Sequence, residues 1–195
     1  MNICIDIDDI LCDLVPTGIA LYNEKAHKNI QLSDITSFHL HECLDSKDAN
    51  EILAIFRSKE IYEYLSPIPD SQWGLRSLIE CGHHVFLATA TPYDSFSNKV
   101  EWVCKHFTCV TPYDIICIQD KSILNCDVMV DDKLDNLTKS VCERVVLNYS
   151  WNISISKDYA YDIYRCQNWL DIVHTINKIE RKYKEWMETT IMEET

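Results

Sequence analysis

The chain has 195 residues, of which 47% are hydrophobic and 25% are charged, and its formal net charge is −13 at pH 7. These proportions are ordinary for a folded globular protein, and the length suits one domain with an insertion or two small domains. The acidic balance argues against a nucleic acid polymer or an anionic membrane as partner, but it allows a small anionic substrate held by a metal ion, a lysine or helix N-termini.

Three features of the sequence bear on its location. The ten cysteines are scattered without a Cys-x-x-Cys pair, so we expect reduced thiols in a reducing compartment. The N-terminus has no basic segment and carries carboxylates within its first ten residues, which is not typical of a signal peptide. No stretch approaches the roughly 20 apolar residues of a membrane span. The sequence therefore predicts a cytoplasmic protein.

The predicted elements alternate, in chain order, between apolar strands and amphipathic helices. Apolar runs predict five strands, at Ile3–Ile7, His84–Ala88, Ile115–Ile118, Val128–Val130 and Val145–Leu147. Helical periodicity predicts helices at Ser71–Cys81, Asp94–Phe107 and Trp169–Trp186. Continuous apolar strands that alternate with amphipathic helices are typical of a parallel sheet covered on both faces. The predicted fold class is therefore α/β, with a Rossmann-like sheet.

The segment between the first two predicted strands is too long for one crossover helix. It runs from about Leu14 to Pro69 and consists mostly of helix-forming stretches, of which Asp48–Phe56 is the clearest. We expect a small helical cap that rises over the carboxyl end of the first strand. The predicted division is an α/β core of residues 1–13 and 70–195 and a cap of residues 14–69.

Polar side chains stand at the ends of the predicted strands or just before one. They are Asp6, Asp8, Thr89, Lys121, Asp131 and Asp132. Because parallel strands place their carboxyl ends at one edge of the sheet, we expect these groups to converge there. Side chains alternate along a strand, so Asp6 and Asp8 are expected on the same side. Carboxylates suit a hard cation such as Mg²⁺, and a lysine and a hydroxyl suit phosphate oxygens. Each residue alone also fits a turn, a strand end or a solvated surface.

This ordered set resembles the haloacid dehalogenase superfamily of phosphatases. Their pattern is Asp-x-Asp after the first strand, Thr or Ser after the second, a later Lys, and an acidic pair after another strand. A closer resemblance is to the 5′(3′)-deoxyribonucleotidase family. The segments that carry it are Ile5-Asp6-Ile7-Asp8-Asp9, Ile35-Thr36-Ser37-Phe38, Tyr64-Leu65-Ser66-Pro67-Ile68-Pro69, Asp120-Lys121-Ser122, Val130-Asp131-Asp132-Lys133, Trp151-Asn152 and Asn168-Trp169.

The resemblance implies a two-step hydrolysis of a phosphate monoester. Asp6 is expected to attack phosphorus and form an aspartyl-phosphate, and Asp8 to protonate the leaving alkoxide and later deprotonate water. Thr89 and Lys121 are expected to bind the phosphate oxygens. The expected substrate is a (deoxy)nucleoside monophosphate.

The resemblance also implies a Mg²⁺ site and a base-binding side. Asp6, the backbone carbonyl of Asp8 and the pair Asp131 and Asp132 are the expected metal ligands. We prefer Asp131 as the direct ligand and Asp132 as its support, although the sequence leaves either order open. The base side is expected to be lined by the cap residues Phe38, His39 and Leu40.

Two departures and two rival functions accompany this interpretation. Asp9 stands where most relatives carry glycine, and Leu14 stands where nucleotidase relatives can carry a base-contacting aromatic. One rival function is a phosphatase of another small metabolite, such as a sugar phosphate. The other is a non-catalytic phosphate- or metal-dependent binding module.

Overall fold

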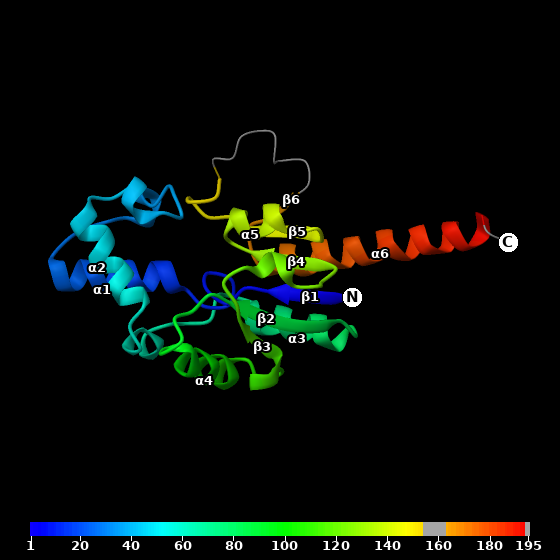
Figure 1. Cartoon of the computed structure of the whole chain (residues 1–195), viewed down its shortest axis with the longest axis horizontal. Coiled ribbons are helices and arrows are strands. Elements are labelled where there is room, and N and C mark those ends of the chain that lie inside the picture. The colour runs from blue at the N-terminus through cyan, green and yellow to red at the C-terminus, as the bar shows by residue number, and fades with distance from the viewer. Residues whose placement is uncertain (154–162, 194–195) are drawn as a thin grey trace.

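The computed structural model describes residues 1–153 and 163–193, with side chains to residue 190. A six-stranded sheet forms its centre, in the strand order β3-β2-β1-β4-β5-β6 (Figure 1). The strands are β1 Asn2–Ile5, β2 His84–Thr89, β3 Ile115–Cys117, β4 Val128–Asp131, β5 Glu143–Leu147 and β6 Ile163–Cys166. Every pairing is parallel, which confirms the predicted α/β fold class.

Two details of the sheet differ from the prediction. Strand β6 was missed, because its run Ile163-Tyr164-Arg165-Cys166 is short and carries a charge at its centre. Strand β1 ends at Ile5 rather than Ile7. It ends there because the chain turns at once: the Ile7 carbonyl accepts hydrogen bonds from the backbone N–H groups of Leu11 and Cys12.

Helices cover both faces of the sheet. They are α1 Leu14–Ala26, α2 Ser46–Phe56, α3 Ser71–Glu80, α4 Phe96–His106, α5 Leu134–Lys139 and α6 Trp169–Glu193. Because side chains alternate along a strand, Ile3 and Ile5 of β1 face a core shared with α3, α4 and α6. Cys4 faces the opposite side, where it packs with Leu137 of α5.

The predicted helical cap after the first strand is confirmed. Helices α1 and α2 and the short 3₁₀ helices η1 Leu32–Asp34, η2 Leu40–Glu42 and η3 Glu60–Glu63 lie between β1 and β2 in the chain. Figure 1 shows α1 and α2 beyond the carboxyl ends of the strands, away from the N-terminus. The two helices approach closely at Gly18, where an added Cβ would collide with the ring of Phe56. The chain returns to the core near Pro67, whose backbone forms an isolated antiparallel β-bridge with that of Cys12.

Helix α6 supports the loop that follows β1. The indole N–H of Trp169 donates a hydrogen bond of 2.8 Å to the backbone carbonyl of Ile10. The same ring lies against Gly74 of α3, where any Cβ would collide with it. Beyond this contact α6 continues past the amino ends of the strands and projects from the rest of the protein (Figure 1).

Two further properties concern the predicted location. All ten cysteines lie within the described residues and are free thiols. None of the described helices combines the length and the apolar character that are needed to cross a membrane.

Candidate active site

The predicted site residues meet beside the central strand. Strand β1 lies between β2 and β4, where the strand order changes direction, and this is the place where open α/β sheets bind ligands. Asp6 follows β1 directly, and its backbone N–H donates to the Val130 carbonyl of β4 at 2.9 Å. That bond sets Asp6 beside Asp131, the last residue of β4, and Asp132, which follows it.

Lys121 lies between two of these carboxylates. Its Nζ atom is 2.8 Å from Oδ1 of Asp6 and 2.8 Å from Oδ2 of Asp131. Burial alone would lower the pKa of Lys121, but the two carboxylates outweigh it and raise that pKa above its usual value. Lys121 is therefore a permanent cation at the floor of the site.

The two acidic residues after β4 have different surroundings. Asp131 accepts three hydrogen bonds from protein groups: Lys121 and Asn136 donate to Oδ2, and the Lys133 backbone N–H donates to Oδ1. Asp132 accepts one, from the indole N–H of Trp151 to Oδ2 at 2.8 Å. Its Oδ1 accepts no hydrogen bond from the described part of the chain, so it is the freer of the two to bind a ligand.

Asp6, Asp131 and Asp132 form the cluster that could hold a metal ion. All three are buried, and one oxygen of each lies within 4.8 Å of the others. Burial raises the pKa of Asp6 to about 7 and raises the pKa of Asp132. Burial is the main cause of both shifts, and the neighbouring Asp131 carboxylate adds to both. A divalent cation among these groups would favour their ionised forms.

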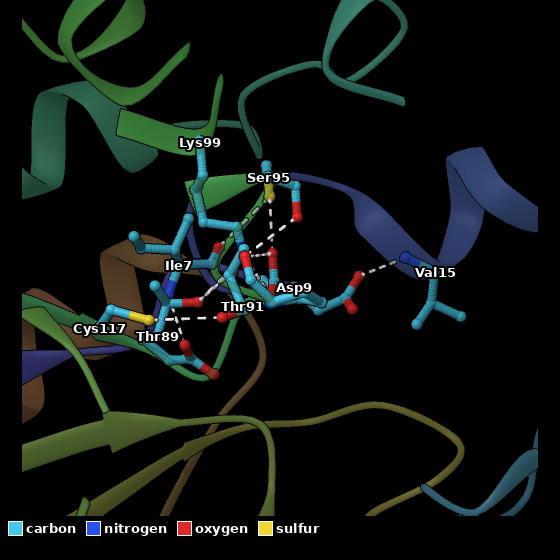
Figure 2. A network of polar contacts seen from close by, with 12 residues as sticks. Ile7, Asp9, Val15, Thr89, Thr91, Ser95, Lys99 and Cys117 are labelled. Atoms are coloured by element: carbon cyan, nitrogen blue, oxygen red, sulfur yellow. Dashed lines mark hydrogen bonds and ion pairs between the residues drawn. The ribbon is translucent and has the colours of Figure 1, made fainter. Parts of the chain in front are cut away.

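Lys99 of α4 is the charged residue of this site that the sequence analysis missed. Its Nζ atom contacts both carboxylate oxygens of Asp8, at 2.6 and 2.7 Å, and the hydroxyl of Thr89 at 2.9 Å. Figure 2 shows Lys99 reaching from α4 toward Thr89 and Thr91. Burial would lower the pKa of Lys99, but the Asp8 carboxylate, together with the nearby Tyr62 and Cys12, outweighs burial and raises that pKa. One signal was present: Lys99 stands three residues after Phe96 and four before Val103, on the apolar face of its helix.

Asp9 forms the turn that follows Asp8. Its backbone has a φ of 53°, a left-handed conformation that favours glycine and that Asp tolerates better than most residues. The Asp9 side chain accepts a hydrogen bond from the Val15 backbone N–H at the start of α1, at 3.0 Å (Figure 2). Burial raises the pKa of Asp9, and the nearby Asp132 adds to this. The residue that departs from the family pattern therefore fits its turn and ties the turn to the cap.

A cavity of about 210 Å³ lies over these groups, between the sheet edge and the cap. Its floor includes Asp6, Asp8, Lys121 and Asp132. Its cap side is mainly apolar and is formed by Leu14, Val15, Ile35, Ser37, Phe38, Leu40, Leu53 and Phe56. The cavity thus joins a charged floor to an apolar wall.

The predicted substrate-contacting residues occupy different places. Phe38 and Leu40 line the cavity, and the Phe38 ring lies under the ammonium group of Lys133, 4.3 Å from its centre. His39 lines an adjacent cavity of about 180 Å³ instead. Thr89 is fully buried behind the floor, where its hydroxyl contacts Lys99 and Thr91.

Comparison with known proteins gives one family and one fold. The family model described as "5′ nucleotidase, deoxy (Pyrimidine), cytosolic type C protein" matches residues 1–183. The chain is similar to a 5′(3′)-deoxyribonucleotidase of Bacillus subtilis, with 24% identity over 87% of this chain and 95% of that protein.

Solved structures share the fold at lower identity. A haloacid dehalogenase-like family hydrolase from Streptococcus pneumoniae superposes with a TM-score of 0.57 and 13% identity, over 90% of this chain and 97% of that one. A haloacid dehalogenase superfamily hydrolase from Ehrlichia chaffeensis gives a TM-score of 0.54 and 15% identity, over 91% and 96%.

Proposed function

The chain belongs to the family of deoxy (pyrimidine), cytosolic type C 5′ nucleotidases, and we propose that it hydrolyses (deoxy)nucleoside monophosphates through a phosphorylated Asp6. Membership makes it a phosphatase of the haloacid dehalogenase superfamily, which sets aside the non-catalytic binding module.

One observation carries the proposal: the cavity has a floor of paired acids and lysine under an apolar wall that contains Phe38. A phosphate group needs cations and an attacking oxygen, while a nucleobase needs an apolar or aromatic surface. The two kinds of surface meet in one cavity, so a ligand with both groups fits it. A small sugar phosphate would leave the apolar wall without a contact.

Asp6 is the proposed nucleophile. Its Oδ1 forms an ion pair with Lys121 at 2.8 Å and accepts a hydrogen bond from the Ile7 backbone N–H at 2.7 Å, which fixes the carboxylate in one orientation. Its Oδ2 accepts no hydrogen bond from the described residues and remains available to attack phosphorus. The bond formed is Oδ2–P, and the bond broken is that between phosphorus and the ester oxygen, which leaves with its electron pair.

Asp8, in its protonated form, is the proposed proton donor to that ester oxygen. It lines the same cavity as Asp6 and is held by Lys99 through both of its oxygens. In the second step, the deprotonated Asp8 takes a proton from the water that attacks the phosphorylated Asp6, which releases phosphate and restores both residues. Lys99 acts through Asp8 and is therefore a positioning residue.

A divalent cation, which we propose to be Mg²⁺, would be held by Asp6 and Asp132. The donor set fits because carboxylate oxygens suit a hard cation and because the five carboxylates Asp6, Asp8, Asp9, Asp131 and Asp132 outnumber the two buried lysines of the floor. The hydrogen bonds favour Asp132 as direct ligand and Asp131 as its support, the reverse of the order preferred from sequence. When bound, the cation would neutralise charge on the phosphate.

Four further proposals accompany the chemistry. We propose that Phe38 and Leu40 contact the nucleoside, and that residues 14–69 form the cap while residues 1–13 and 70–195 form the core. Thr89 is proposed to act on the phosphate only if Lys99 and Thr91 release its hydroxyl. A cytoplasmic location is proposed and is supported by the ten free thiols.

Phosphate release from a substrate panel tests the proposal. The panel contains 5′ and 3′ monophosphates of deoxyribonucleosides and ribonucleosides and a sugar phosphate, each with Mg²⁺ and with a chelator. We expect Mg²⁺-dependent turnover of nucleotides and a loss of several orders of magnitude in Asp6→Asn, as the loss of a nucleophile produces. A higher specificity constant for the sugar phosphate would favour the rival substrate, and Asp6→Asn within tenfold of wild type would mean that another group attacks phosphorus.

A further inference from the structure

The end of helix α6 carries exposed apolar side chains that the catalytic site does not use. Trp169, Ile172, Ile176 and Ile179 on the same helix are fully buried in the core. Beyond them, Trp186 is 65% exposed and Met187 is 51% exposed. A lone exposed apolar residue needs no explanation, but two large neighbours on a projecting helix do.

The exposed residues continue the buried stripe of the helix. The apolar positions 169, 172, 176, 179, 183 and 186 follow one another at alternating intervals of three and four residues, which places them along one face of a helix. Tyr183 is partly buried, and Trp186 is the next residue of the stripe. The apolar stripe of α6 therefore continues beyond the part of the helix that packs against the core of this chain.

The overhang, residues 182–193, lies away from the catalytic site, and all but its first two residues come after the region that defines the family. Figure 1 shows it beyond the N-terminal edge of the sheet, at the opposite end from the cap. The family match ends at residue 183, so Trp186 and Met187 come after the part of the chain that the family shares. Catalysis in this family does not account for them.

The charges along the helix indicate what covers the overhang. The stretch 178–184 has four basic residues, Lys178, Arg181, Lys182 and Lys184, and one acidic residue, Glu180, whereas the charged residues that follow, Glu185 and Glu188, are acidic. A second copy laid antiparallel sets the basic part of each helix against the acidic part of the other, whereas a parallel copy sets like charges together. Lys182 pairs with Glu143 and Lys184 with Glu180 in this chain, but exposed pairs are weak and compete little with such contacts.

We propose that two copies of this chain associate through antiparallel overhangs of α6, with Trp186 at the centre of the interface. At 1.5 Å per residue, the overhang of about 12 residues is roughly 18 Å long. An antiparallel copy brings its helix end to the base of this overhang, where a depression of about 420 Å³ is lined by Glu143, Tyr164 and Tyr183. Contacts in this depression add buried surface to that of the helix pair. They bring the total closer to the ~1,000 Å² that a specific protein–protein interface buries. The arrangement is two-fold and closes at two copies.

The mass of the full chain in solution tests the proposal. Sedimentation velocity over a concentration series should show twice the 22.8 kDa chain mass at high concentration. Trp186→Glu should raise the dimer Kd by roughly tenfold or more, as loss of a central aromatic does, while phosphate release per chain stays at the wild-type rate. Tyr113→Glu is the matched control, because Tyr113 is 97% exposed on the β3 side of the molecule, and it should leave the Kd unchanged. A wild-type monomer at every concentration, or an equal Kd for wild type and Trp186→Glu, overturns the proposal.

Charge exchange tests the orientation. In an antiparallel pair, Lys184→Glu should weaken the dimer, and the double variant Lys184→Glu with Glu188→Lys should restore it. In a parallel pair, identical positions face each other, so neither variant should change the Kd. A dimer that is insensitive to both variants would refute the antiparallel arrangement, and helix content by circular dichroism should be the same in all variants.

Discussion

Lys99 holds Asp8 through both carboxylate oxygens, at 2.6 and 2.7 Å, from a helix on the far side of strand β2. Lys121, from the segment before β4, contacts one carboxylate oxygen of Asp6, Oδ1, at 2.8 Å. Each of the two carboxylates proposed to act on the substrate therefore has its own buried ammonium group. The two lysines have different consequences, because one orients the proposed proton donor and the other orients the proposed nucleophile.

Lys99→Met should lower kcat by roughly 10²-fold, the scale on which a misplaced acid–base group acts. The loss should be larger for an alkyl ester than for an activated aryl phosphate, since the aryl leaving group needs little protonation. Lys105→Met is the control, because Lys105 lies on the same helix but is exposed. Equal losses on both substrates would show that Lys99 supports the fold rather than Asp8.

Asp8→Asn should inactivate the enzyme toward natural esters while sparing part of its activity toward an aryl phosphate. The amide keeps the shape of the side chain but can neither donate the proton nor activate water. Rapid-quench mass spectrometry with the aryl substrate should then show a protein that has gained one phosphoryl group, because its hydrolysis is slowed. No such species, together with equal losses on both substrates, would remove Asp8 from the acid–base role.

Lys121→Met should lower kcat/KM because the transition state loses about 2–4 kcal/mol of stabilisation, the range of one electrostatic contact in a site without water. It should also lower the Tm of the metal-free protein, because Asp6 and Asp131 lose the cation between them. Mg²⁺ should recover part of the lost Tm. A variant with wild-type kcat/KM and Tm would mean that Lys121 neither binds phosphate nor balances these carboxylates.

Phe38→Ala should raise the KM for nucleotides, because the base loses stacking on the ring that is worth ~1–3 kcal/mol. Phe38 is 47% exposed, so the variant should keep its Tm, and hydrolysis of a base-free phosphate should stay near the wild-type rate. Leu40→Ala is an informative comparison, because Leu40 is buried in the cap and its loss should lower the Tm. If Phe38→Ala affects both substrates alike, its ring does not contact the base.

The metal-free protein should lose stability as pH rises from 6.5 to 8. Burial raises the pKa of Asp6 to about 7, against about 3.9 in an unfolded chain. Below pH 7 the folded state therefore holds a proton that the unfolded state lacks, and this advantage disappears as pH rises. Thermal melts in chelator should show a falling Tm, and Mg²⁺ should raise the Tm more at pH 8 than at pH 6.5 because it binds ionised carboxylates. Asp6→Asn should flatten the chelator profile, and a wild-type Tm that rises over this range would contradict the assignment.

The sequence predicted the sheet and the convergence of Asp6, Lys121 and Asp132 because both follow from local pattern. Apolar runs indicate parallel strands, and the ends of parallel strands share an edge. The superfamily was identified from the residues at the strand ends, and the closer family from additional segments such as Tyr64–Pro69 and Trp151-Asn152. The family match confirms both.

Features that depend on contacts between distant elements could not be predicted from local sequence pattern. Lys99 reaches Asp8 across 91 positions of sequence, and only its place on an apolar helix face hinted at a buried role. The different hydrogen bonds of Asp131 and Asp132 depend on Lys121, Asn136 and Trp151, which come from three separate segments. The early end of β1 depends on the turn at Asp9, which strand periodicity does not register.

The contact between Trp169 and the Ile10 carbonyl has a consequence for synthesis of the protein. The first strand made is the central one, and its neighbours β2 and β4 begin 82 and about 126 residues later. The loop that holds Asp8 gains its last support only when Trp169 has left the ribosome. Until then β1 has two open edges, so the nascent chain depends on rapid completion, or on a chaperone, to avoid pairing with other strands.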